Sequence, residues 1–62
     1  MEETRELRVG QKWRWSNHEH LVITDMTGDT IETVLHDEDV HTSSVMVIRR
    51  DDFRALTLLA DR

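Results

Sequence analysis

Two segments rich in β-branched residues stand on either side of Gly28, and this arrangement constrains the fold more than any other feature of the chain. His20–Asp25 and Thr30–Leu35 each combine Val, Ile, Leu and Thr in the manner of a strand. Between them, Met26-Thr27-Gly28 predicts a three-residue hairpin loop, with Gly28 in the left-handed conformation that glycine tolerates. The sequence therefore predicts an antiparallel hairpin in the middle of the chain.

The predicted loop also fixes a register, in which apolar side chains meet on one face as a half-buried hairpin requires. The pairs on this face are Ile23 with Ile31, Leu21 with Thr33 and, at the tip, Asp25 with Asp29. The pairs on the other face are Thr24 with Thr30, Val22 with Glu32 and His20 with Val34. The like-charged pair at the tip is expected to cost a little stability.

Two further strands are predicted on either side of this hairpin. Lys12–Ser16 alternates polar and aromatic residues with a period of two, which is typical of a strand. Ser43–Ile48 is apolar on both faces near its end, so we expect it to lie centrally in a sheet or to be covered on both sides.

The C-terminal segment allows two interpretations. In the first, Asp51 or Asp52 caps one helical turn, Phe53 enters the core, and Ala55–Leu59 forms a short fifth strand. In the second, apolar side chains at a spacing of three form one face of a continuous helix, Asp51–Ala60. The first gives an all-β fold, and the second gives an α+β fold with a four-stranded sheet and a C-terminal helix.

The chain has 62 residues and no cysteine, so it forms one domain at most, and no disulfide or thiolate-bound metal stabilises it. We expect residues 1–8 to be a flexible or weakly ordered tail and residues 9–60 to form the domain. A chain of this length buries only about 60% of its unfolded surface. Its stability therefore needs an economical core or self-association.

Four strands, a one-turn helix and a last short strand follow one another over 9–59. This order resembles the SH3-like small barrels, the group that includes SH3, Tudor and KOW domains. The segment 50–53 (Arg-Asp-Asp-Phe) stands where such barrels have the short helix before their last strand. The resemblance implies an all-β, five-stranded barrel. It does not imply the ligands of these families, because the chain has no tyrosine and only Trp13, Trp15 and Phe53 for an aromatic cage.

The net charge of the chain disfavours one class of function. The chain has 13 acidic and 8 basic residues, a net charge of −5, which disfavours non-specific binding to a nucleic-acid backbone. We expect a small non-enzymatic protein-interaction module, an accessory or regulatory protein of bacterial or phage type, whose acidic surface meets a basic partner protein. No apolar run approaches the roughly 20 residues of a membrane span, so we expect a cytoplasmic protein without membrane contact.

Two alternative functions stay open. The first is a nucleic-acid-binding barrel that uses Lys12–Trp15 and Arg49–Arg54, with aromatic stacking beside basic side chains. The second is a structural homo-oligomer or virion component. Its contact would be an open sheet edge, which the absence of proline leaves unprotected.

Three groups of side chains are candidates for partner binding. Trp13 and Trp15 share one face of their predicted strand and either stack on a ligand or fill the core, and we favour the core because so small a domain needs their bulk. The basic group contacts an anionic partner or pairs with the aspartates beside it, and its members are Arg49, Arg50 and Arg54. The acidic group is a solvated loop or a cation site, and its members are Asp37, Glu38 and Asp39.

The histidines raise a metal hypothesis. If the hairpin strands extend, His18 lies opposite His36, with His20 two residues along on the same face and His41 nearby. Imidazoles in this geometry can bind Zn²⁺. The same face also carries threonines and a glutamate, so we expect solvated histidines and no metal or cofactor.

No sequence motif indicates an enzyme. The chain lacks cysteine and a glycine-rich phosphate loop. A barrel of this size also has little room for a deep substrate pocket. We therefore expect no catalytic residues.

Overall fold

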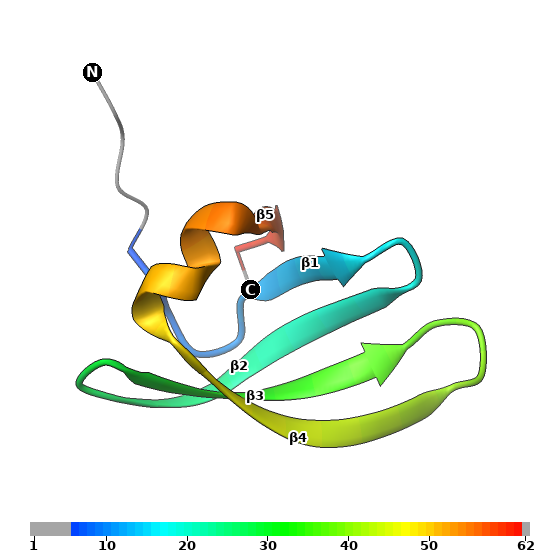
Figure 1. The fold of residues 1–62 in the computed structure, drawn as a ribbon, viewed down its shortest axis with the longest axis horizontal. Helices are drawn as coiled ribbons and strands as arrows, with labels where there is room; N and C mark the ends of the chain where they lie inside the picture. Colours follow the sequence, from blue (N-terminus) through cyan, green and yellow to red (C-terminus); the bar gives the residue numbers. More distant parts are fainter. Residues whose placement is uncertain (1–5, 62) are drawn as a thin grey trace.

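The computed structural model describes residues 6–61, which form five strands and one short helix (Figure 1). The strands are β1 (Lys12–Ser16), β2 (Glu19–Thr27), β3 (Thr30–Asp37), β4 (Thr42–Arg49) and β5 (Thr57–Ala60). A 3-10 helix, η1 (Arg50–Ala55), connects β4 to β5. The all-β prediction is confirmed, and the alternative of a continuous C-terminal helix is wrong.

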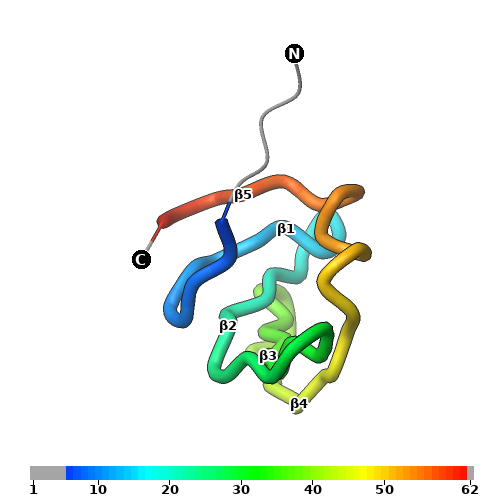
Figure 2. Tube along the Cα trace, turned by 90° about the vertical axis from the view of Figure 1, so that its left-hand side faces the viewer, coloured from blue at the N-terminus to red at the C-terminus, as the bar shows by residue number. Residues whose placement is uncertain are grey.

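All neighbouring strands are antiparallel and form one sheet in the order β4-β3-β2-β1-β5. The sheet curves strongly, and η1 spans from one side of the curve to the other (Figure 2). The outermost strands, β4 and β5, are not hydrogen-bonded to each other, so the sheet is not closed. This arrangement is compatible with an SH3-like barrel but does not confirm one.

The β2–β3 hairpin is present where the sequence predicts it, but its register is different. Thr27 pairs with Thr30, so the turn contains two residues, and Gly28 takes the expected positive φ of 58°. Ile23 lies opposite Thr33 rather than Ile31. The predicted register is therefore wrong, including the like-charged pair at the tip.

A β-bulge explains how the core survives this different register. The register shifts between Ile23 and Asp25, which leaves Thr24 as the extra residue. The bulge reverses the alternation of side chains beyond it, so Met26 rather than Asp25 lies opposite Ile31. Apolar side chains consequently reach the core on both sides of the bulge.

The position of β4 corrects a second expectation. The sequence pattern predicts a central or doubly covered strand, whereas β4 is an edge strand of the sheet. Val45 and Val47, which alternate with the core-facing residues, are 76% and 57% exposed. The apolar residues on the second face of β4 are therefore not covered by the described part of the chain.

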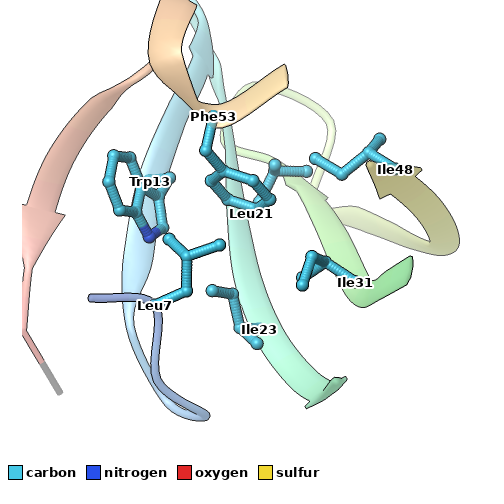
Figure 3. Close-up of a cluster of buried hydrophobic side chains, with 7 residues drawn as sticks. All are labelled: Leu7, Trp13, Leu21, Ile23, Ile31, Ile48 and Phe53. Atoms are coloured by element: carbon cyan, nitrogen blue, oxygen red, sulfur yellow. The ribbon is translucent and has the colours of Figure 1, made fainter. Parts of the chain in front are cut away.

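The core lies on the inner, concave side of the curved sheet (Figure 3). Its buried apolar side chains are Leu7, Trp13, Leu21, Ile23, Ile31, Ile48 and Phe53. The ring of Phe53 contacts that of Trp13 edge-on, with 5.1 Å between centroids and an angle of 75° between the planes. Because Phe53 belongs to η1, this contact fixes the helix on the core.

The segment before β1 is part of the packed structure. Leu7, which the sequence places in the tail, is buried in the core. Behind it, the buried amide of Gln11 accepts hydrogen bonds from the Arg8 backbone N–H and the Trp13 indole N–H, both at 3.1 Å. The same amide donates to Asp61 Oδ1 at 2.8 Å, which connects the two ends of the domain. Residues 1–5 lie outside the described part of the chain.

None of the helices within residues 6–61 has the length and apolar character needed to cross a membrane.

Candidate functional site

The outer, convex face of the sheet carries two neighbouring cross-strand rows of side chains. Strand pairing aligns the first row as Arg14, His20, His36 and Ser43. It aligns the second row as Lys12, Val22, Val34 and Val45. A polar row containing two histidines therefore lies beside a row composed mainly of valine.

An open groove of about 470 Å³ follows this boundary, and we call it the histidine groove. Its lining residues are Lys12, His20, Val22, His36, Asp37, Glu38, His41, Thr42 and Ser43. The groove thus combines imidazoles and carboxylates with one valine from the sheet. Such an open surface suits an extended segment better than a small substrate, which needs an enclosed pocket.

An ionic network anchors the β3–β4 loop to the outer face. Glu38 Oε2 lies 2.7 Å from Nδ1 of His20 and 3.2 Å from Nη1 of Arg14. The hydrogen bond with His20, followed by the contact with Arg14, holds the pKa of Glu38 below its ordinary value of 4.5. One carboxylate in the loop therefore connects to side chains from both β1 and β2.

His36 forms the second pair of contacts in the groove. Its ring stacks on that of His20, with centroids 5.1 Å apart and planes 29° apart. Its Nδ1 atom is 2.9 Å from Oγ of Ser43 on β4. A serine–histidine contact resembles a nucleophile and its base, but among residues 6–61 no carboxylate hydrogen-bonds to His36 to orient the ring.

Asp37 shapes the loop that follows β3. Its Oδ1 atom accepts hydrogen bonds from the backbone N–H groups of Asp39 at 2.9 Å and Val40 at 3.2 Å. These bonds, with that from Val40 the stronger cause, keep the pKa of Asp37 below its ordinary value of 3.8. His41, whose φ is 59°, closes the loop by donating its N–H to the carbonyl of Asp37 at 2.9 Å.

The structure separates the two tryptophans. Trp13 is only 4% exposed and lies in the core, as we expected for at least one of them. Trp15 is 37% exposed, and a register shift between Arg14 and Ser16 makes it the bulged residue of β1. The two rings therefore do not form one stacking surface.

The three arginines also differ from one another. Arg50 donates from Nη2 to the carbonyl of Gly28 at 3.0 Å, and so supports the tip of the hairpin. Arg49 and Arg54 are exposed. Within residues 6–61, none of the three forms an ion pair with Asp51 or Asp52, although Asp52 accepts a hydrogen bond from the backbone N–H of Arg49.

Sequence reasoning missed two features of this surface. The first feature is the exposure of the valines of β4. The sequence pattern predicts that they are buried, because a strand with two apolar faces is usually covered. The second feature is the pairing of His20 with His36. The predicted register instead placed His18 opposite His36 and Val34 opposite His20. A local signal for the first feature is present in the sequence. Ser43 and Ser44, which directly precede Val45, make the start of this strand polar on both faces, as is typical of an exposed strand.

Comparison with known proteins adds no assignment, since the chain matches no family model, no curated protein and no solved structure.

Proposed function

We propose that this protein is a small protein-interaction module that binds an extended segment of a partner protein along the free edge of β4. The observation that carries the proposal is the exposure of Val45 and Val47 on an edge strand. Edge strands of isolated proteins are usually protected by lysine, proline or a covering segment. β4 has none of these within the described chain.

Strand addition gives affinity and selectivity by separate means. Backbone groups on the free edge of β4 pair with those of the added segment, whatever its sequence. Alternate side chains of that segment then lie beside the valines and extend the row formed by Val22, Val34 and Val45. Covering an exposed valine contributes about 1.5 kcal/mol.

The charges around β4 favour a basic partner. Glu32 lies opposite Val47 on the outer face, and the acidic loop 37–39 precedes the strand. The chain as a whole carries a net charge of −5. We therefore infer a partner segment that alternates β-branched residues with lysine or arginine, since complementary charge speeds and orients docking.

The strand order bears on the kind of module that we propose. The sheet order and the helix between β4 and β5 support an SH3-like module. For this module we propose an accessory or regulatory role in a bacterial or phage cytoplasm. Nucleic-acid binding has less support, because Trp13 is buried in the core and Arg50 is engaged with Gly28.

The test uses a short synthetic peptide of alternating valine and lysine and amide NMR shifts of the labelled protein. We expect the largest shifts along β4. The double variant Val45→Lys and Val47→Lys should weaken binding at least about tenfold. The matched control is Leu59→Lys, which changes an exposed residue on the opposite edge strand, β5, and should leave the affinity unchanged. Shifts that map to β5, or equal losses in both variants, would contradict the proposal.

A second candidate, self-association through the same edge, has one specific observation in its favour. If two copies pair antiparallel about Met46, Val45 of each lies opposite Val47 of the other, so the exposed valines are self-complementary. Sedimentation equilibrium separates the candidates. A dimer that the valine variants dissociate supports self-association, and a monomer at all concentrations excludes it.

A further inference from the structure

Three side chains with metal-binding atoms meet at one end of the sheet, and neither His20 nor His36 of the histidine groove is among them. His18 comes from the β1–β2 turn, Glu19 begins β2, and Asp37 ends β3. One ligand atom from each lies within 4.8 Å of the other two. Figure 1 shows the β1–β2 turn and the β3–β4 loop side by side at this end, and the backbone N–H of Glu38 donates to the carbonyl of His18 at 2.7 Å.

The two carboxylates of this cluster belong to residues that lie opposite each other in the sheet. Glu19 and Asp37 are directly paired across β2 and β3. Like charges in this position destabilise a sheet. Within residues 6–61, no lysine or arginine forms an ion pair with either carboxylate, and Nε2 of His18 lies 3.7 Å from Oδ2 of Asp37. A cation between the two carboxylates would turn this repulsion into attraction.

Hydrogen bonds hold both carboxylates in orientations in which, among the described residues, one oxygen of each accepts no hydrogen bond. Oε1 of Glu19 accepts a hydrogen bond from Oγ of Ser16 at 2.7 Å. Oδ1 of Asp37 is occupied by the backbone of the following loop, whereas its Oδ2 lies 3.7 Å from Nε2 of His18. Supporting hydrogen bonds of this kind orient the ligands of known metal sites.

We propose that His18, Glu19 and Asp37 bind a divalent transition-metal ion of the zinc type. Neighbouring ligand atoms of a tetrahedral zinc site lie about 3.3 Å apart. The separation of 3.7 Å between His18 and Asp37 is already near this value. All three ligand atoms lie within 4.8 Å of one another, so binding would require side-chain rotations that bring them closer. One imidazole with two carboxylates suits Zn²⁺ better than Mg²⁺ or Ca²⁺, which prefer sites made only of oxygen.

The proposed site differs from the three-histidine site that the sequence raises. His20 is engaged with Glu38 and stacks on His36, and His36 contacts Ser43. His18, by contrast, has a ligand atom within 4.8 Å of ligand atoms of both Glu19 and Asp37. With three protein ligands, the ion would keep one position open to water or to a partner's side chain.

The test is calorimetric titration of the metal-free protein with ZnCl₂, with MgCl₂ and CaCl₂ as parallel arms. We expect one Zn²⁺ per chain and no heat with the other two ions. Asp37→Asn and Glu19→Gln should each weaken Zn²⁺ binding by at least about tenfold. Both variants retain the oxygen that accepts the structural hydrogen bond, so the loop and the turn keep their conformation.

His41→Asn is the matched control, because His41 is a nearby exposed imidazole outside the cluster and asparagine tolerates its positive φ. This variant should bind Zn²⁺ as the wild type does. The amide NMR spectrum of each variant verifies that it is folded. Three results would overturn the proposal: no Zn²⁺ heat with the wild type, unchanged affinity in Asp37→Asn, or an equal loss in His41→Asn. None of these results depends on the free edge of β4. The Zn²⁺ titration therefore tests the metal site alone, and the peptide experiment tests the proposed function.

Discussion

The two faces of the same sheet use apolar residues in opposite ways. On the inner face, the side chains of Leu21, Ile23 and Ile31 are at most 1% exposed. On the outer face, Val45 and Val47 are largely exposed although the strand that carries them is fully formed. The inner residues form the core of the fold, whereas the outer valines are left uncovered within residues 6–61 and are the surface that we propose a partner covers.

Polar groups show the same division. On the inner face, the fully buried hydroxyl of Thr33 donates to the carbonyl of Met46 at 2.7 Å, and among the described residues no buried side-chain polar atom lacks a partner. On the outer face, His20 and Glu38 form their contacts at the surface. The polar groups of the inner face are therefore satisfied by the fold itself, whereas those of the outer face lie where solvent can reach them.

The largest expected effect is on the inner face. Phe53→Ala removes the ring that packs η1 against Trp13 and should lower the free energy of unfolding by about 3–5 kcal/mol. In so small a domain this loss leaves much of the protein unfolded at 25 °C. Urea denaturation measures it, with Phe53→Leu as the milder control. A loss below about 1 kcal/mol would show that η1 does not depend on the core.

The next effect concerns the buried amide of Gln11. Gln11→Met leaves the indole N–H of Trp13 without its acceptor and should cost about 1–3 kcal/mol in urea denaturation. The matched control on the outer face is Thr24→Val, which removes an exposed hydrogen bond to the carbonyl of Glu32 and should cost under about 0.5 kcal/mol. Equal costs would remove the distinction between the two faces.

The inner face was also the more predictable from the sequence. Alternation around Gly28 located the hairpin, and the position of Phe53 after two aspartates located the helical turn and its buried ring. The register could not be derived, because the bulge at Thr24 depends on which apolar residues the rest of the core needs. The predicted three-residue loop was wrong, although Gly28-Asp29 is itself a residue pair typical of the observed two-residue turn.

The outer face was less predictable for a related reason. Exposure of Val45 depends on which strand ends up at the edge of the sheet, and strand order is a property of the whole chain. The cluster of His18 with Glu19 and Asp37 likewise needs the true register, which brings Glu19 opposite Asp37. A sequence identifies the residue types of a site well before it identifies their partners.

A smaller effect is expected from pH at the outer face. The pKa of Glu38 is lowered in the folded protein, so its ionised form adds stability above its unfolded pKa and this stability is lost as the pH falls through the folded value. Below about pH 5, the wild type should therefore lose stability more steeply than Glu38→Gln. Thermal unfolding in EDTA measures both proteins free of metal. Parallel pH profiles would show that the contacts of Glu38 with His20 and Arg14 do not contribute.

The smallest effect on stability should come from the exposed valines themselves. Val45→Thr and Val47→Thr retain the β-branched shape that a strand favours and change only surface that is already in water. We expect the free energy of unfolding to stay within about 0.5 kcal/mol of the wild type for each. Binding of the valine–lysine peptide should nevertheless weaken, because the threonine hydroxyl loses part of the gain from burial. A contrary result would be a loss of more than about 1 kcal/mol of stability in either variant with peptide binding intact. The valines of the outer face would then stabilise the fold, as the apolar residues of the inner face do.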